Sequence, residues 1–335
     1  MTQISIGDMA QAFLLRQQMT ALKQASQTAA TEVASGRTTD ISRHRGGDIG
    51  PIVAIETTLQ RLEGFRQATS ETAQRAAQMQ STLDTIRDLV GELPMQLLSF
   101  ETMASPESRN AITTQARDRF DSVVRALNTA PAGKTLFAGV ETEGPALTDA
   151  DSILDMLETA ITTAGATDAA DIISVIDGWF GDPAGFSTLG YLGGAGTTAV
   201  PISPEDRVEL GTTAADPALR DTLKSLATAA LLERGIASDT TIADTIAHHA
   251  GEGLLQGNAN RIELAARIGL AEGRIEQAIN RNKAETTALQ ISLNDMLSVD
   301  PYDAAARLKE TQSQLENLYA VTARISRLRL VDFLR

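Results

Sequence analysis

Two adjacent histidines, His248 and His249, are the residues of this chain best suited to acid–base or metal chemistry. They lie in a stretch with helical periodicity, where His248 and Glu252 fall on one face, and Asp244 lies one turn earlier. A zinc site needs three or four protein ligands, and this group does not supply a convincing set. Because the chain contains 43 acidic residues, we interpret the group as part of a solvated polar helix face.

A nucleophilic site finds no better support. Cysteine is absent, which excludes disulfides, thiolate metal ligands and a cysteine nucleophile. A serine nucleophile would need His44 or one of the paired histidines as its base, and no G-x-S-x-G sequence supports one. Residues 190–196 are glycine-rich, but the Gly-Lys-Ser/Thr of a phosphate loop does not follow them. We therefore expect a protein that is not an enzyme, with no metal site and no cofactor.

The composition narrows the choice of partners. A formal net charge of −14 argues against nucleic acid or an anionic membrane as a main partner, since both require clustered Lys and Arg. Aromatic residues make up only 4% of the chain, which favours long helices packed through narrow seams over a bulky core. The first residues lack the charged and apolar regions of a secretory signal peptide, so we expect that any export uses another route.

Long helices are predicted for the N-terminal third. Residues 6–35 have heptad-like apolar spacing, and Gly36 is placed to end that helix. A second helix is predicted over 52–98, and a third begins at Ser105, where a hydroxyl followed by Pro106 is typical of a helix N-terminus. The seam of the first helix consists of Leu15, Met19, Leu22, Ala29 and Val33.

The middle of the chain, residues 135–238, changes character and holds most of the glycines. A turn and a short strand are predicted over 131–140, and two further strands over 199–202 and 208–210. A helix is predicted to begin at Asp216, ahead of Pro217. Two short helices are predicted to start at capping pairs, Thr148 with Asp151 and Asp168 with Asp171.

Helical periodicity resumes near residue 239 and continues to 297. After a break at 298–301, Asp300 is predicted to cap a final helix. Apolar residues gather toward the end of that helix: Leu318, Val321, Ile325, Leu328, Leu330, Val331, Phe333 and Leu334.

These segments predict a mainly α fold: an elongated antiparallel helical bundle or coiled coil built from both chain ends, with a small mixed α+β insertion domain. The predicted segments are an N-terminal assembly helix, a core arm, the insertion, a second core arm and a C-terminal assembly helix. Their bounds are 1–35, 36–134, 135–238, 239–298 and 299–335.

The chain ends carry more apolar surface than their own pairing covers. Burying each large apolar side chain contributes roughly 1.5–3 kcal/mol, and exposed surface of this kind marks an oligomer interface. An ordinary coiled-coil tail that pairs only within one chain fits the pattern equally well. The predicted assembly interface is Leu15, Met19, Leu22, Leu318, Val321, Ile325, Leu328, Leu330, Phe333 and Leu334.

Three segments resemble one known family. Residues 33–37, VASGR, are similar to its "LSTGKR" motif after the first helix, and residues 134–147, KTLFAGVETEGPAL, to its "LFGGTKTDTPPF" segment. Residues 320–334, AVTARISRLRLVDFL, are similar to its "ARISQLSLLDYL" terminus. On these motifs the chain resembles the flagellin superfamily and, within it, the hook-associated protein 3 family. It departs from the family in lacking the "MRIST" opening and the "INxPSDDP" loop, and in having Arg329.

The resemblance implies a secreted structural subunit of the bacterial flagellum, exported by the flagellar type III apparatus through an uncleaved, disordered N-terminal segment. It implies terminal helices that order on assembly into a ring layer at the hook–filament junction, between hook-associated protein 1 and flagellin. It also implies an export chaperone on the C-terminal helix before export, and no nucleic acid or membrane partner. The alternatives are a filament flagellin and, in another class, a cytoplasmic coiled-coil scaffold.

Overall fold

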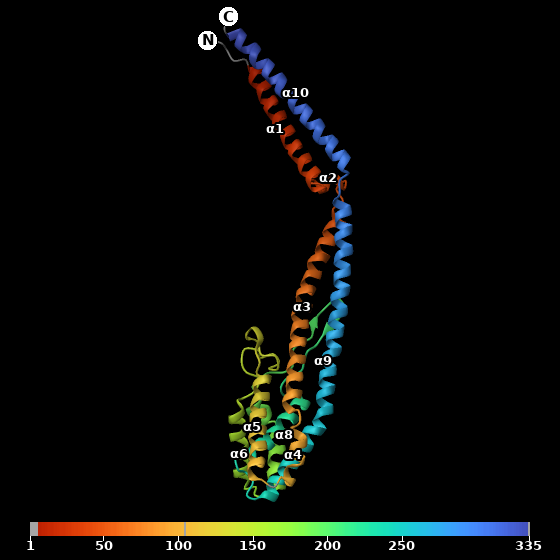
Figure 1. Ribbon diagram of the computed structural model, residues 1–335. Coiled ribbons are helices and arrows are strands. Elements are labelled where there is room, and N and C mark those ends of the chain that lie inside the picture. Colours follow the sequence, from red (N-terminus) through yellow and green to blue (C-terminus); the bar gives the residue numbers. More distant parts are fainter. Residues whose placement is uncertain (1–5, 104, 334–335) are drawn as a thin grey trace. The chain divides into compact units, whose positions relative to one another are not determined.

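The structure is a computed structural model that describes residues 6–103 and 105–333 (Figure 1). The chain divides into two compact units, one formed by residues 1–62 and 283–335 and the other by residues 63–282. Two long helices, α3 (Gly50–Val90) and α9 (Thr240–Leu297), contribute to both units. The predicted fold class is confirmed: long helices pack against one another, and the described part contains one small two-stranded sheet.

The first unit is built around an antiparallel pair of helices from the two ends of the chain. α1 (Ile6–Ser35) and α10 (Pro301–Phe333) lie side by side and run in opposite directions (Figure 1), and we call this pair the α1–α10 hairpin. α1 ends as predicted at Gly36, which has φ +67° and donates its N–H to the Glu32 carbonyl at 2.8 Å. α10 begins as predicted under Asp300, whose carboxylate accepts the Tyr302 N–H at 2.7 Å.

Backbone hydrogen bonds join the two chain segments at the closed end of this hairpin. The Thr38 N–H donates to the Leu297 carbonyl at 2.8 Å, and the Val299 N–H donates to the Gly36 carbonyl at 3.1 Å. A short helix, α2 (Ile41–His44), follows and is capped by Asp40, whose carboxylate accepts the Arg43 N–H at 3.0 Å. Specific backbone and capping hydrogen bonds therefore order the chain at this closed end.

The second unit holds the main hydrophobic core. α8 (Pro217–Leu231) lies at its centre, with Leu219, Leu223 and Leu226 almost completely buried. α5 (Pro106–Leu127) packs along α8, and α6 (Ala150–Ala164) and α7 (Ala169–Gly181) complete the cluster (Figure 1). The remaining elements are α4 (Leu93–Leu98), η1 (Phe100–Thr102), η2 (Pro131–Gly133), η3 (Phe186–Gly190), β1 (Val200–Pro201) and β2 (Arg207–Val208).

The two strands are shorter than predicted but lie at the expected place. β1 and β2 pair antiparallel, with Val200 opposite Val208. Asn282, on α9, donates its amide to the Ile202 carbonyl at 2.9 Å, and Arg281 pairs with Asp206 at 2.7 Å. These contacts with α9 thus hold the β1–β2 hairpin in place within the second unit.

Three local predictions are wrong. The helix predicted over 52–98 ends at Val90, because Gly91 adopts φ +39° and a new helix, α4, begins with Pro94 in its first turn. α6 is capped by Asp149, whose carboxylate accepts the Ser152 N–H at 2.9 Å, and not by Thr148. No strand forms over 131–140, because the chain closes on itself there: Thr135 bonds to the carbonyls of residues 142 and 144.

Candidate assembly surface

The α1–α10 hairpin covers its own seam only in part. Leu15, Met19 and Leu22 on α1, with Leu318 and Ile325 on α10, are half-buried and none is fully enclosed. The apolar residues of α1 and α10 that are buried, among those with described side chains, are small: Ala29 and Ala304. Small residues permit close helix approach but bury little apolar area, so this seam stabilises a single chain weakly.

Large apolar side chains are also exposed on the outside of the hairpin. Phe13 is 68% exposed and Met9 is 61% exposed, and these two lie one turn apart on α1. Phe13 precedes Leu15 by two residues, so it points about 200° away from the seam. On α10, Val321 is 49% exposed. We call Met9, Phe13, Leu14, Tyr319 and Val321 the exposed apolar set of the hairpin. Val321 flanks the seam, since it lies about 60° from Leu318 around α10.

The ten predicted interface residues fall into three groups. Leu15, Met19, Leu22, Leu318 and Ile325 belong to the half-buried seam, and Val321 belongs to the exposed apolar set. The backbone of α10 includes Leu328, Leu330 and Phe333, but their side chains lie outside the described part of the structure, and Leu334 lies outside the described residues. The role of the ten residues in assembly stays a prediction.

A buried carboxylate at the closed end of the hairpin was not predicted. Glu32 is only 5% exposed, and its Oε1 accepts the Thr39 N–H at 3.1 Å and the Thr39 hydroxyl at 3.2 Å. The Thr38 hydroxyl donates to the same oxygen at 3.4 Å, and Arg307 Nη2 lies 3.5 Å from Oε2. We call Glu32, Thr38, Thr39 and Arg307 the Glu32 junction, because one side chain joins α1, the following loop and α10.

The residues considered for chemistry do not assemble into a site. His248 Nδ1 lies 3.8 Å from Glu252 Oε1, and both side chains are about half exposed. Asp244 is engaged elsewhere, in an ion pair with Arg109. His44 is exposed at the end of α2. Among the described residues, no three His, Asp or Glu side chains are placed to hold a metal ion together.

The glycine-rich segment 190–196 serves packing. Gly194 donates its N–H to the Ala138 carbonyl at 2.9 Å, and the Tyr191 hydroxyl donates to the Gly194 carbonyl at 2.7 Å. Burial of the Tyr191 ring raises the pKa of its phenol. These contacts bind the loop to the buried segment around Phe137.

Residues 257–334 match the bacterial flagellin C-terminal helical region. The C-terminal part of the chain is flagellin-like. The match covers most of α9, from residue 257 onward, and α10, and therefore the half of the hairpin that carries Leu318, Val321 and Ile325.

A solved structure supports the fold. The chain resembles a candidate flagellar hook-associated protein from Vibrio parahaemolyticus with a TM-score of 0.53 and 12% sequence identity; the likeness covers 72% of this chain and 94% of that one. At this identity the likeness shows a shared fold. No curated protein matches the sequence. In the part of the chain that the structure describes, no helix has both the length and the hydropathy of a membrane span.

Proposed function

We propose that this protein is a non-enzymatic structural subunit of the bacterial flagellum that assembles through the α1–α10 hairpin. The observation that carries the proposal is the incompletely covered seam and the exposed apolar set of this hairpin, half of which lies in the flagellin-like region. Phe13 and Val321 would be buried by neighbouring subunits, and each buried side chain of this size contributes roughly 1.5–3 kcal/mol.

Within the flagellum, the proposed place is the ring layer at the hook–filament junction, between hook-associated protein 1 and flagellin. The likeness to a candidate hook-associated protein in fold supports this place, as does the "LFAGVETEGPAL" segment of residues 136–147. The proposal includes secretion by the flagellar type III apparatus without a cleaved signal peptide, and an export chaperone that covers the C-terminal helix beforehand. It includes no nucleic acid or membrane partner.

A filament flagellin is the second candidate, and it is favoured by the description of the family that residues 257–334 match. The two functions use the same surface and differ in position and copy number. Deleting the gene separates them. Bare hooks with unpolymerised flagellin in the medium would place the protein at the junction, whereas hooks that keep their junction proteins but lack filaments would make it the flagellin.

Point variants test the assembly surface directly. We expect Phe13→Asp with Val321→Asp to abolish incorporation, since a charge would be placed on a surface that neighbours bury. The monomer should melt at an unchanged temperature, because both side chains are exposed in it. The matched control is Met95→Asp, on α4 of the second unit, which is 63% exposed and should incorporate normally. Normal flagella from the Phe13/Val321 variant would refute the proposed surface.

A further inference from the structure

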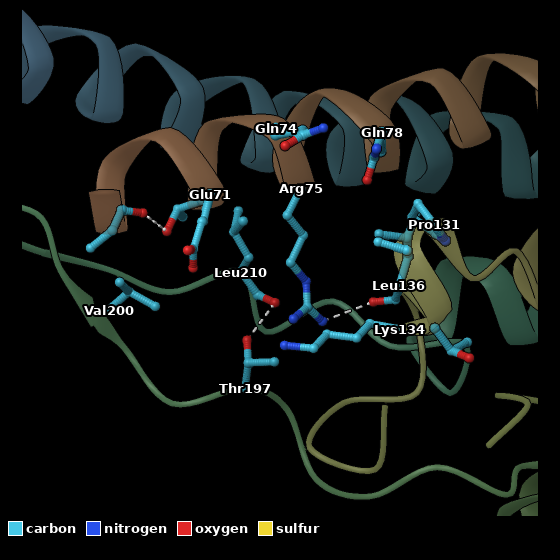
Figure 2. A pocket seen from close by; sticks show the side chains of 14 residues that line it. Glu71, Gln74, Arg75, Gln78, Pro131, Lys134, Leu136, Thr197, Val200 and Leu210 are labelled. Carbon is cyan, nitrogen blue, oxygen red and sulfur yellow. Dashed lines mark hydrogen bonds between the residues drawn. The ribbon is translucent and has the colours of Figure 1, made fainter. Parts of the chain in front are cut away.

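A cleft in the second unit contains a cation without a counterion. Its volume is about 410 Å³, and it is lined by one face of α3, by residues 131–136 and by Thr197, Val200 and Leu210 (Figure 2). Arg75 extends from α3 into this cleft, where its Nη2 donates to the Leu136 carbonyl at 3.0 Å. The site is thus formed by three segments that are far apart in the sequence.

Two other sheltered arginines of this unit form ion pairs, unlike Arg75. Arg109 is paired with Asp244, and Arg234 is paired with Asp151 at 3.1 Å. Arg75 forms no ion pair with any described residue, and its Nε is buried without a hydrogen-bond partner. Arg261 also forms none with the described residues, but it does not line this cleft. Burial lowers the pKa of this guanidinium, as expected for a cation that leaves water without a compensating charge. A sheltered charge of this kind is destabilising unless an anion accompanies it.

A second cation faces the same space. The side chain of Lys134 runs along the cleft toward the guanidinium of Arg75 and toward Thr197 (Figure 2). Like Arg75, Lys134 forms no ion pair with the described residues. The Thr197 hydroxyl is already committed as a donor to the Leu210 carbonyl at 2.8 Å. Two cations therefore face the same cleft, and no carboxylate of the described residues forms an ion pair with either.

The turn that presents Lys134 is strained. Ala132 has φ +52° and ψ 30°, and it is the one described residue other than glycine with a positive φ. A left-handed conformation is unfavourable for a residue with a β-carbon, because that carbon lies too close to the following carbonyl oxygen. The surrounding structure holds this turn at the rim of the cleft, directly before Gly133 and Lys134.

One acidic residue, Glu71, also lines the cleft. It lies one helical turn before Arg75 on α3, but it is exposed and forms no ion pair with it. Its carboxylate would compete weakly with an incoming anion through solvent. The Glu71→Gln variant is therefore informative, because removing this negative charge should strengthen anion binding if the cleft is a site.

We infer that this cleft is a binding site for an oxyanion of the carboxylate or phosphate type, held between the guanidinium of Arg75 and the ammonium of Lys134. The planar guanidinium matches two oxygens of such a group, and an ammonium adds a compact charge at its side. Two sources offer this chemistry: a free small anion, or an acidic side chain of a second copy of this chain, which carries 43 Asp and Glu. The inference is independent of the flagellar role.

Thermal unfolding of the full chain tests the site. Trp179 is the sole tryptophan and lies in the second unit, so its fluorescence reports on the unit that contains the cleft. Sodium phosphate and sodium acetate are compared with sodium chloride at equal ionic strength. A bound anion should raise the melting temperature saturably, and at 100 times the dissociation constant it would increase the folding equilibrium constant about 100-fold.

Three substitutions decide the result. Arg75→Gln and Lys134→Gln should each abolish the saturable rise, and Glu71→Gln should reach it at a lower anion concentration. Lys134 is exposed, so its variant folds even if Arg75→Gln does not. Arg125→Gln is the matched control: it makes the same charge change on an exposed residue paired with Asp121, and it should keep the full rise. An equal rise in the wild type, Arg75→Gln and Lys134→Gln would overturn the inference.

Sedimentation at increasing protein concentration then separates the two sources. If a carboxylate of a second copy fills the cleft, phosphate and Lys134→Gln should each weaken self-association several-fold, while Arg125→Gln should not. If a free anion fills it, self-association is unchanged by phosphate although the melting temperature rises.

Discussion

Arg307, in the second turn of α10, lies 3.5 Å from the carboxylate of Glu32, near the end of α1. The two partners differ in environment: the Glu32 side chain is 7% exposed and the Arg307 side chain is 55% exposed. The buried Glu32 carboxylate also accepts hydrogen bonds from Thr38 and Thr39. The carboxylate therefore depends mainly on the loop after α1, and the ion pair with α10 adds to a site that is already formed.

This difference predicts an order among three substitutions. Glu32→Ala removes the carboxylate that accepts from Thr38 and Thr39 and should destabilise the junction by about 1–3 kcal/mol. Glu32→Gln keeps an acceptor for the Thr39 N–H and should cost less. Arg307→Gln should cost less than about 1 kcal/mol, because an exposed ion partner contributes little. Hydrogen exchange at the Thr39 amide measures the order, and an Arg307→Gln effect as large as that of Glu32→Ala would contradict it.

The local sequence predicted most of the helix N-termini correctly. Ser105, Asp168 and Asp300 cap α5, α7 and α10 as predicted, since a cap depends only on a side chain and a backbone N–H a few residues later. The same rule gave the wrong residue at α6, where Thr148 and Asp149 are adjacent candidates. The break at Gly91 was missed because apolar spacing continues through it into α4.

The two polar sites could not be predicted, because each depends on distant parts of the chain. Arg75 bonds to the Leu136 carbonyl 61 residues away, and periodicity placed Arg75 only on a helix, without a neighbour. Glu32 is buried by a loop and by α10, which an acidic residue near a helix C-terminus does not indicate. Sequence patterns show which face of a helix is apolar, but not which polar residues that face will meet.

Arg261 provides a test of an unpaired buried charge in the second unit. It is 8% exposed, burial lowers its pKa, and its Nε has no hydrogen-bond partner. Its guanidinium donates to the Thr222 hydroxyl at 3.0 Å and to the Leu254 carbonyl at 3.2 Å, and it forms no ion pair with the described residues. Replacing buried charges by apolar side chains of similar volume is often stabilising, so Arg261→Met should raise the free energy of unfolding by about 1 kcal/mol.

Denaturant unfolding followed by Trp179 fluorescence measures this change. The comparison variant is Arg267→Met on the same helix, whose guanidinium is 55% exposed and pairs with Asp216 at 2.9 Å. It should lower stability by less than about 1 kcal/mol. A loss of stability in Arg261→Met would mean that its two hydrogen bonds outweigh the cost of burying the charge.

Acid should destabilise the second unit through Asp151. Its carboxylate pairs with Arg117 at 2.9 Å and Arg234 at 3.1 Å, and the hydrogen bond from Arg117 is the main cause that lowers its pKa. Because the folded pKa lies below the unfolded one, the unfolded chain binds the proton first as pH falls. The contribution is complete above the unfolded pKa of about 3.9 and is lost as pH falls through the lower folded value.

Asp151→Asn should therefore flatten the decline in unfolding free energy between about pH 5 and pH 3 while lowering the value at pH 7. Asp118→Asn is the control, since Asp118 is exposed on α5 and forms no ion pair with the described residues. Equilibrium unfolding at several pH values gives both curves. Parallel curves for the wild type and Asp151→Asn would show that other carboxylates govern the acid limb.

Gly139 has the most restricted environment among the glycines with positive φ. Its φ is +65°, and a β-carbon there would lie 2.1 Å from the Ala195 carbonyl oxygen, an atom that accepts the Val140 N–H at 3.0 Å. Gly139→Ala must either break this contact or distort the buried segment around Phe137, so we expect a loss of more than about 2 kcal/mol. Gly144→Ala, in the same loop, meets no atom within 4 Å and should change stability by less than about 0.5 kcal/mol. Unfolding followed by Trp179 fluorescence compares the two variants, and equal stabilities would show that the 135–144 loop relaxes without cost.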